Sequence, residues 1–302
     1  MARTPIIIDC DPGVDDALAL LLALASPDEL DILGITAVAG NVTLAKTQYN
    51  AQRILTLAAR ADVPLHAGSA SPMLIDLHTT EVHGGDGVGG AALPEPAAPL
   101  ASVNGVAFLN DSLSARPGEI TLCCLGPLTN PALAITNRKN VLGDARQVVM
   151  MGGSSERGNV TEHAEFNFFV DPHAARLVFL SGAELVMIGL NLTRQVPITD
   201  ARIAQIAAVG TKSALAAQQM LEVYGRGDTA MHDPCVIAYL LQPELFSGHR
   251  AWVDIEVNNA EHIGQSIIKD ISEAGAANAL VLDKVDADGF FELLCERLGR
   301  LP

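Results

Sequence analysis

Four aspartates lie within eight residues near the start of the chain. They are Asp9, Asp11, Asp15 and Asp16. Two carboxylates a few ångströms apart repel each other by about 1 kcal/mol in water, and by several times more in a partly dry site. A proton or a hard cation with oxygen ligands relieves this repulsion. The cluster therefore predicts a metal-assisted enzyme.

The elements around these aspartates predict how they are presented. Residues 6–9 form a β-branched run, a turn follows at 11–13, and a helical pattern continues to Ala25. Alternate side chains of a strand share a face, so we expect Asp9 and Asp11 to point the same way and Cys10 to point into the core. Asp15 and Asp16 open the helix, where the dipole and the free N–H groups favour negative charge. Helix capping explains one or two of the carboxylates but not all four.

Strand and helix patterns alternate along the rest of the chain. Further strands are predicted at 31–39, 63–66, 120–125, 147–151, 185–190, 252–257 and 279–282. Helices are predicted at 44–60, 128–135, 172–180 and 286–300 and over most of 200–241, and a long loop is predicted at 68–99. This order is typical of an α/β fold with an open, mostly parallel sheet and helices on both faces. Without a low-complexity linker or an internal repeat, residues 1–302 are predicted to form a single domain.

Polar residues follow several of the predicted strands. They are Asp9 and Asp11, Gly40-Asn41, Gly126-Pro127, Gly152-Gly153 and Asn191. Ligands of open α/β sheets bind outside the carboxyl ends of the strands. We therefore expect these residues to face one crevice.

Composition limits the partners and the location. The formal net charge is −16, which repels phosphate backbones and argues against a nucleic-acid polymer as partner. The five cysteines show no C-x-x-C pair, which argues against a disulfide framework or a zinc site. No signal peptide and no uninterrupted apolar span is apparent, so a cytoplasmic protein without a membrane partner is expected.

An ordered set of motifs resembles one known family. Residues 9–17, Asp-Cys-Asp-Pro-Gly-Val-Asp-Asp-Ala, resemble the signature of the inosine–uridine preferring nucleoside hydrolases. Further matching segments are 38–43, 83–87, 125–130, 150–153, 158–161, 164–167, 171–172 and 232–233. They follow the family's order over residues 6 to about 240. The resemblance implies a Rossmann-like fold and a calcium-dependent nucleoside N-ribohydrolase of nucleoside salvage, commonly a homotetramer or homodimer.

The resemblance also implies a metal site and a base. Asp11, Asp16 and Asp233 would bind Ca²⁺ through carboxylates, and Leu125 would bind it through its backbone carbonyl. An all-oxygen site without Cys or His suits calcium better than zinc. The ion would make a bound water more acidic and Asp11 would accept its proton, so that the water attacks the anomeric carbon.

The remaining site residues implied by the resemblance bind the nucleoside. Asp15 and Asn167 would hold the 2′ and 3′ hydroxyls, Asn159 and Glu165 the 5′ hydroxyl, Asn41 the ribose edge, and Tyr224 the base. His232 is the leading candidate for the acid that protonates the departing base, and His83 is a second candidate.

Several alternatives remain open at this level. A non-catalytic ribose- or nucleoside-binding protein of the same fold would keep the ribose contacts without turnover. A phosphatase of the haloacid-dehalogenase type also carries D-x-D after its first strand, but Gly13 and the Asp15-Asp16 pair depart from that pattern. Purine or pyrimidine preference depends on the loops 74–90 and 223–231, whose conformations the sequence does not give.

Overall fold

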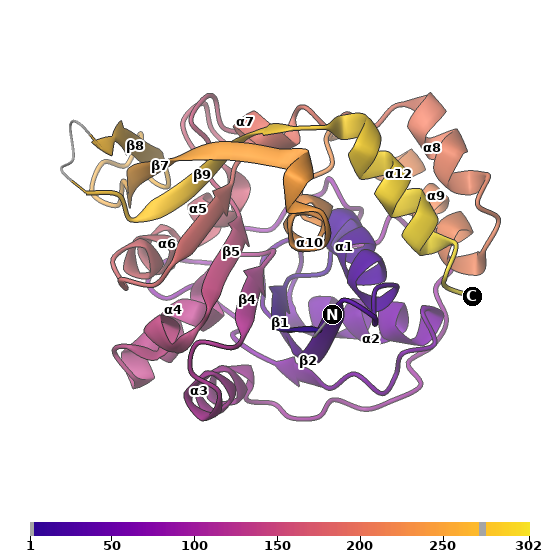
Figure 1. Ribbon diagram of the computed structural model, residues 1–302, viewed down its shortest axis with the longest axis horizontal. Coiled ribbons are helices and arrows are strands. Elements are labelled where there is room, and N and C mark those ends of the chain that lie inside the picture. The colour runs from indigo at the N-terminus through magenta and orange to yellow at the C-terminus, as the bar shows by residue number, and fades with distance from the viewer. Residues whose placement is uncertain (1–2, 272–275) are drawn as a thin grey trace.

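Nine strands form one sheet in the computed structural model, which describes residues 3–271 and 276–302 (Figure 1). The strands are β1 (Thr4–Cys10), β2 (Leu30–Ala37), β3 (Leu65–Ala67), β4 (Thr121–Cys124), β5 (Gln147–Met151), β6 (Leu185–Ile188), β7 (Phe246–Ile255), β8 (Ser266–Asp270) and β9 (Ala279–Val285). Their order across the sheet is β3-β2-β1-β4-β5-β6-β9-β7-β8. The strands from β3 to β9 in this order pair in parallel, whereas β7 is antiparallel to both β9 and β8. The predicted mostly parallel sheet is confirmed.

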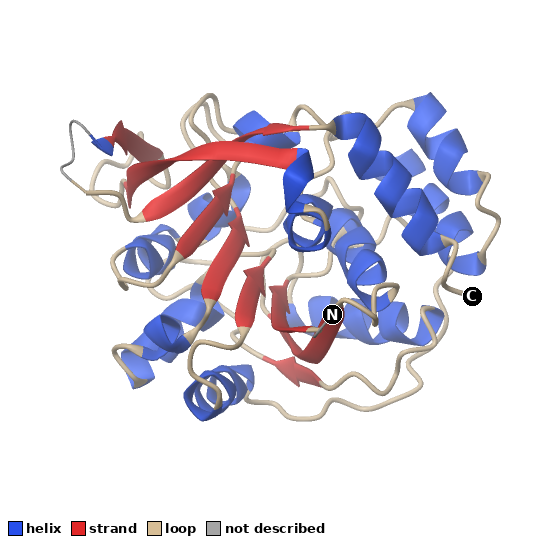
Figure 2. Ribbon diagram, in the orientation of Figure 1, coloured by secondary structure: helices blue, strands red, loops and turns tan. Residues whose placement is uncertain are grey.

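Helices cover both faces of the sheet, as predicted (Figure 2). They are α1 (Val14–Leu24), α2 (Leu44–Leu57), α3 (Gly105–Ala115), α4 (Thr129–Asn137), α5 (Phe166–Val170), α6 (Pro172–Phe179), α7 (Leu190–Thr193), α8 (Asp200–Ala207), α9 (Lys212–Tyr224), α10 (Pro234–Leu241) and α12 (Ala287–Leu298). Two short 3-10 helices lie at Val141–Asp144 and Pro243–Leu245.

Alternation along β1 divides the core into two layers. Ile6, Ile8 and Cys10 belong to one buried cluster, which also contains residues of α1, α2, α9, α10 and α12. Ile7 belongs to the other cluster, with residues of α3, α4 and α6. Side chains of a strand alternate between faces, so each β1 residue contributes to one layer only. Cys10 lies in the core as expected.

Helix α1 is buried on all sides. Each of its eleven residues is buried, from Val14 to Leu24, and α2, α9, α10 and α12 pack against it. Its Ala- and Leu-rich sequence suits this position because both residues combine high helix propensity with apolar side chains. The helix begins directly after β1, so its amino terminus carries Asp15 and Asp16 at the carboxyl edge of the sheet.

The structure differs from the sequence prediction at helix α3, which was not predicted, and at the carboxyl-terminal part of the sheet. Strand β7 begins at Phe246 instead of Trp252, and β8 was not predicted at all. Residues 247–250 of β7 are exposed, so they lack the apolar alternation that reveals a half-buried strand. In the part of the chain that the structure describes, no helix is long and apolar enough to span a membrane.

Candidate active site

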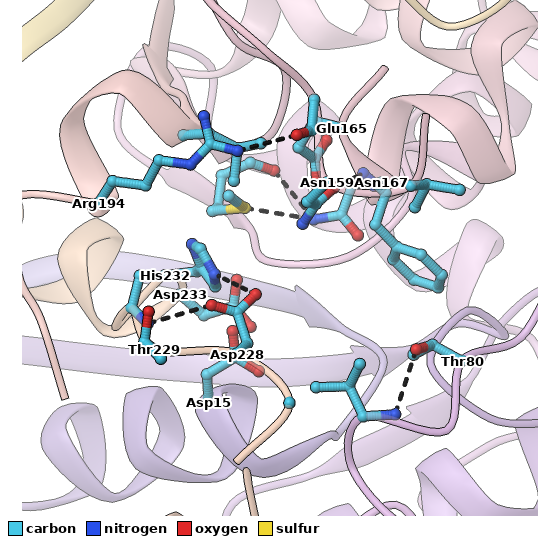
Figure 3. Close-up of a pocket in the computed structure, with 18 of the residues that line it drawn as sticks. Asp15, Thr80, Asn159, Glu165, Asn167, Arg194, Asp228, Thr229, His232 and Asp233 are labelled. Atoms are coloured by element: carbon cyan, nitrogen blue, oxygen red, sulfur yellow. Dashed lines mark hydrogen bonds and ion pairs between the residues drawn. The ribbon is translucent and has the colours of Figure 1, made fainter. Parts of the chain in front are cut away.

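A cavity of about 940 Å³ opens at the carboxyl ends of the parallel strands (Figure 3). The predicted site residues that line it are Asp15, Asn41, His83, Leu125, Asn159, Glu165, Asn167, Tyr224, His232 and Asp233. Asp11 and Asp16 lie beneath the wall, only 1% and 0% exposed, and both bond to Asn41. Asn191 lies elsewhere, because it lines a second, smaller cavity. The expectation that every polar strand end faces one crevice is therefore wrong for Asn191, and also for Asp9, which lies below the cavity.

The Asp16 side chain stabilises the turn between β1 and α1 through hydrogen bonds. Its Oδ1 accepts from the backbone N–H of Asp11 at 3.1 Å, and its Oδ2 accepts from the N–H of Gly13 at 2.9 Å. The Asn41 side chain, from the segment after β2, donates to the same Oδ2 at 3.1 Å. Asp16 thus satisfies free N–H groups at the helix start, as a capping residue does. Capping accounts for this carboxylate and leaves the other three to be explained.

Three buried carboxylates converge at the cavity floor. One oxygen from each of Asp15, Asp16 and Asp233 lies within 4.8 Å of the other two. Burial, followed by the charge of Asp15, raises the pKa of Asp16 to about 6. Burial and the charges of Asp15 and Asp16 raise the pKa of Asp233 well above its usual range. These shifts mean that the cluster resists holding its full negative charge without a counterion.

Asp11 presents one carboxylate oxygen without a protein partner. Its Oδ2 accepts from the backbone N–H of Asn41 at 2.7 Å, whereas its buried Oδ1 has no hydrogen-bond partner among the described residues. Gly40 and Gly126 flank the carboxylate so closely that a Cβ at either position would overlap it. Burial, followed by the charge of Asp16, raises the pKa of Asp11 well above its usual range. Two glycines therefore make room for a carboxylate that is suited to accept a proton.

Asp9 belongs to the structure below the site. It accepts from the Thr36 hydroxyl and from the Asn130 side chain, the latter at 2.7 Å, and it is fully buried. Burial is the main cause that raises the pKa of Asp9 to about 7. The Asn130 side chain also bonds to the backbone of Ala37 and Ser69. Asp9 thus joins β1 to β2 and α4 beneath the cavity.

The carbonyl of Leu125 faces the cavity next to Asn167. The Asn167 side-chain N–H₂ group donates to the Leu125 oxygen at 2.7 Å and to the Met151 oxygen at 3.2 Å. These bonds orient the amide so that Oδ1 is the atom available to a ligand. A carbonyl oxygen carries two lone pairs, so that of Leu125 retains one acceptor position.

Glu165 and Asn159 lie on the loop between β5 and α5. Both oxygens of Glu165 accept backbone N–H groups, from Asn167 at 2.8 Å and from Gly153 at 2.8 Å among them. The Asn159 Oδ1 accepts from the Phe166 N–H at 2.9 Å. The Asn159 amide nitrogen is therefore the atom of this pair that remains free to donate to a ligand.

His83 reaches the cavity from the long loop and stacks on Tyr224. The ring centroids are 5.0 Å apart at an interplanar angle of 18°. The His83 Nδ1 accepts from the backbone N–H of Val14 at 3.0 Å, and burial lowers the pKa of His83 to about 4. The ring is therefore neutral near pH 7, and we assign its proton to Nε2. A neutral ring of this kind can donate a hydrogen bond from Nε2.

His232 is held from both sides. Its Nδ1 lies 2.7 Å from the Thr193 hydroxyl, and its Nε2 lies 3.1 Å from a carboxylate oxygen of Asp228. Burial acts to lower the pKa of His232, but the hydrogen bond and charge of Asp228, followed by the charges of Asp15 and Glu165, outweigh it and raise the pKa. His232 is thus the imidazole in the cavity that favours the protonated state.

Sequence reasoning missed several residues that line the cavity. They include Thr80, Arg157, Glu162, Arg194, Asp228 and Thr229. Asp228 lies four residues before His232, but residues 228–232 are not helical, so this spacing is not a signal that sequence reasoning could use. Arg157 and Arg194 belong to none of the motifs. Arg194 follows a helix of only four residues, which is too short to show a periodic pattern.

Comparison with known proteins identifies the family of the chain that forms this cavity. The family model described as "Inosine-uridine preferring nucleoside hydrolase" matches residues 6–292. The chain belongs to this family. It is a nucleoside N-ribohydrolase, an enzyme that hydrolyses ribonucleosides, and its family is metal-dependent. The resemblance inferred from the motifs is therefore confirmed.

Individual relatives cover nearly the whole chain. An uncharacterised protein of Schizosaccharomyces pombe is 44% identical over 98% of this chain and 99% of its own. The pyrimidine-specific ribonucleoside hydrolase RihA of Photobacterium profundum is 41% identical over 98% of both chains. Among solved structures, a purine-preferring ribonucleoside hydrolase from Gardnerella vaginalis matches with a TM-score of 0.91 and 27% identity over 98% of both chains.

Proposed function

We propose that this nucleoside hydrolase uses calcium to cleave the N-glycosidic bond of pyrimidine ribonucleosides, releasing ribose and the free base for nucleoside salvage. The observation that carries the proposal is the cluster of buried carboxylates at the cavity floor, together with the buried Oδ1 of Asp11, which has no hydrogen-bond partner among the residues described. The pyrimidine preference is supported by the RihA relatives, which are named as pyrimidine-specific.

The residues present fit a calcium ion. The oxygen atoms of a calcium site lie 2.3–2.6 Å from the ion, so two of them are separated by at most about 5 Å. One carboxylate oxygen from each of Asp15, Asp16 and Asp233 lies within 4.8 Å of the other two, and Oδ1 of both Asp11 and Asp15 is buried with no hydrogen-bond partner in the part of the chain that the structure describes. Carboxylates and a carbonyl oxygen are the ligands that calcium prefers. The motifs imply that Asp11, Asp16, Asp233 and the carbonyl of Leu125 would hold the ion. Of these residues, Asp16 and Asp233 belong to the cluster of oxygens, whose third member is Asp15.

The chain's own residues supply the base and the ribose contacts. When bound, the ion supplies positive charge that makes a nearby water more acidic. Asp11 takes a proton from the water that attacks the anomeric carbon, through its Oδ1 atom, which bonds to no group of residues 3–271 and 276–302. Asp15 and Asn167 hold the 2′ and 3′ hydroxyls. Hydrogen bonds that strengthen as the sugar becomes oxocarbenium-like accelerate the step.

The other end of the cavity handles the 5′ hydroxyl and the base. The Asn159 side chain donates a hydrogen bond to the 5′ hydroxyl, and Glu165 stabilises the loop that carries Asn159. His232 protonates the departing base, because Asp228 favours its charged form. His83 donates a hydrogen bond from Nε2 to the base, and Tyr224 supports the His83 ring by stacking.

The activity is tested with chelator-treated enzyme and a panel of uridine, cytidine, inosine and adenosine. Calcium is expected to restore release of reducing sugar, with the highest kcat/KM for the pyrimidine nucleosides. Asp11→Ala is expected to lose at least about 100-fold in kcat, the scale of general-base catalysis. Full activity in chelator, or intact uridine in saturating calcium, would count against the calcium proposal.

The assembly and the location are also proposed from the family resemblance. We infer a homodimer or homotetramer in the cytoplasm, and light scattering of the purified protein measures the subunit number directly. A single mass of about 31.6 kDa at micromolar concentration would contradict the oligomer.

A further inference from the structure

We propose that Arg194 is a positioning residue for the 5′-hydroxyl end of the substrate, acting through the backbone that carries Asn159. The inference rests on the proposed function, in which Asn159 binds the 5′ hydroxyl. Arg194 is the residue that follows α7, and its side chain extends across the cavity rim toward Asn159 and Glu165 (Figure 3).

The guanidinium of Arg194 binds two consecutive carbonyls. Its two terminal nitrogens donate to the Arg157 oxygen at 2.7 Å and to the Gly158 oxygen at 2.9 Å. These carbonyls belong to the two residues immediately before Asn159. A planar fork with fixed donors restrains both carbonyls at once, which a lysine ammonium does less well. Arg194 therefore fixes the direction in which the chain enters Asn159.

The loop transmits this restraint to the Asn159 side chain. The N–H groups of Asn159 and Val160 both point to the Ala164 oxygen, at 3.2 and 3.3 Å. Gly158 lies so close to the Ala164 carbonyl that a Cβ there would overlap it. The Asn159 Oδ1 in turn accepts from Phe166 at the start of α5. A shift of the 157–158 backbone must therefore move Asn159 or break these bonds.

The neighbouring residue provides an internal control. Thr193 bonds to His232, on the base side of the cavity, whereas Arg194 bonds to the loop on the 5′ side. Consecutive residues at the end of α7 thus reach opposite parts of the substrate cavity. A change at Thr193 is expected to affect departure of any base, and a change at Arg194 is expected to affect only substrates that carry a 5′ hydroxyl.

The test compares uridine with 5′-deoxyuridine in calcium-saturated enzyme. We expect Arg194→Ala and Asn159→Ala each to lower kcat/KM for uridine by about 10- to 100-fold, the effect of misplacing a binding group by an ångström. On 5′-deoxyuridine both variants should stay within about twofold of the wild type. Arg194→Lys, which can engage one carbonyl, should give an intermediate loss on uridine. Thr193→Val should lower activity on both substrates by the same factor.

A double variant separates positioning from direct contact. If Arg194 acts through Asn159, Asn159→Ala combined with Arg194→Ala should be no slower on uridine than Asn159→Ala alone. Losses that multiply would mean that Arg194 touches the substrate itself, and equal losses on uridine and 5′-deoxyuridine would mean a general structural role. Either result overturns the inference, as does a wild-type enzyme that does not distinguish the two nucleosides. If the proposed function itself is wrong, the result is different, because the wild-type enzyme then leaves uridine intact.

Arg194→Gln serves as the second variant should Arg194→Ala not fold. It keeps a planar donor without the charge, and it should show the same dependence on the 5′ hydroxyl with a smaller loss. Thermal melting of each variant checks that the fold is retained. Arg116→Ala, at a partly exposed arginine paired with Glu119 outside the cavity lining, is the matched control and should leave the uridine to 5′-deoxyuridine ratio unchanged.

Discussion

Neutralising Asp233 should stabilise the metal-free protein and abolish its stabilisation by calcium. Asp233 lies within 4.8 Å of both Asp15 and Asp16, and burial and their charges raise its pKa well above the usual range. Asp233→Asn removes one negative charge from this cluster and retains the size of the side chain. It also removes a carboxylate that calcium needs, so the same substitution should act in opposite directions in the two states.

The size of the effect follows from the spacing. Two unit charges at 4.8 Å repel by about 3.5 kcal/mol at an effective dielectric constant of about 20, so two such pairs give about 7 kcal/mol. Protonation limits this cost, because protonating an aspartate of ordinary pKa at pH 7 takes only about 4 kcal/mol. We therefore expect Asp233→Asn to raise the metal-free stability by about 2–4 kcal/mol, which is roughly 3–6 °C in Tm for a chain of this size.

Thermal melting at pH 7 with chelator, and then with excess calcium, measures both effects. The wild type should gain stability with calcium by mass action, whereas Asp233→Asn should gain little. Asp76→Asn, at an exposed loop aspartate, is the control for loss of a single negative charge and should change stability by less than about 0.5 kcal/mol. A metal-free Asp233→Asn protein less stable than the metal-free wild type would refute the reasoning about repulsion. Undiminished stabilisation by calcium would refute the assignment of Asp233 as a ligand.

Three further outcomes are expected. Gly126→Ala should lower kcat by about tenfold or more while the fold is retained. A Cβ at this position overlaps Asp11 and displaces a general base that contributes at least about 100-fold to kcat. An unchanged kcat would contradict this packing. His232→Gln should lower kcat by about 100-fold or more on uridine but little on p-nitrophenyl riboside, because that leaving group departs without a proton. Equal losses of kcat on the two substrates would exclude the acid role. Burial lowers the pKa of His83 from 6.5 to about 4, so protonation of this ring should destabilise the wild type as the pH falls from about 6.5 to 4. If Tm of His83→Phe falls with the same slope over this pH range, the contribution of His83 is refuted.

Most of the sheet and the floor of the site could be predicted from local signals. The β1 strand and the aspartate turn adjoin each other in sequence, so a short pattern contains both the element and its chemistry. The position of Asn41 followed from the rule that parallel strands end at the same edge. Asn191 shows the limit of that rule, because α7 begins at Leu190, directly after β6, and turns its side chain toward Ser155 and Leu282.

The rest of the site depends on tertiary contacts that no local pattern encodes. Asp228 adjoins His232 through the conformation of the 225–231 segment, whose turn residues show no strand or helix periodicity. Arg194 reaches two carbonyls far away in sequence, and any exposed arginine after a helix would look the same. The pairing of His83 with Tyr224 joins the long loop to α9, and only the folded chain brings these segments together.

The burial of α1 has a consequence for changing the ion. A helix enclosed by four others cannot shift to suit a smaller cation, and its first turn is further fastened by Asp16 to the backbone of Asp11 and Gly13. Asp233 enters from the start of α10, whose residues from Pro234 to Ala238 are buried and which packs against α1 and α12. Helices α1 and α10 hold each other in place, so a site redesigned for magnesium or manganese has to change its ligand side chains instead of moving either helix.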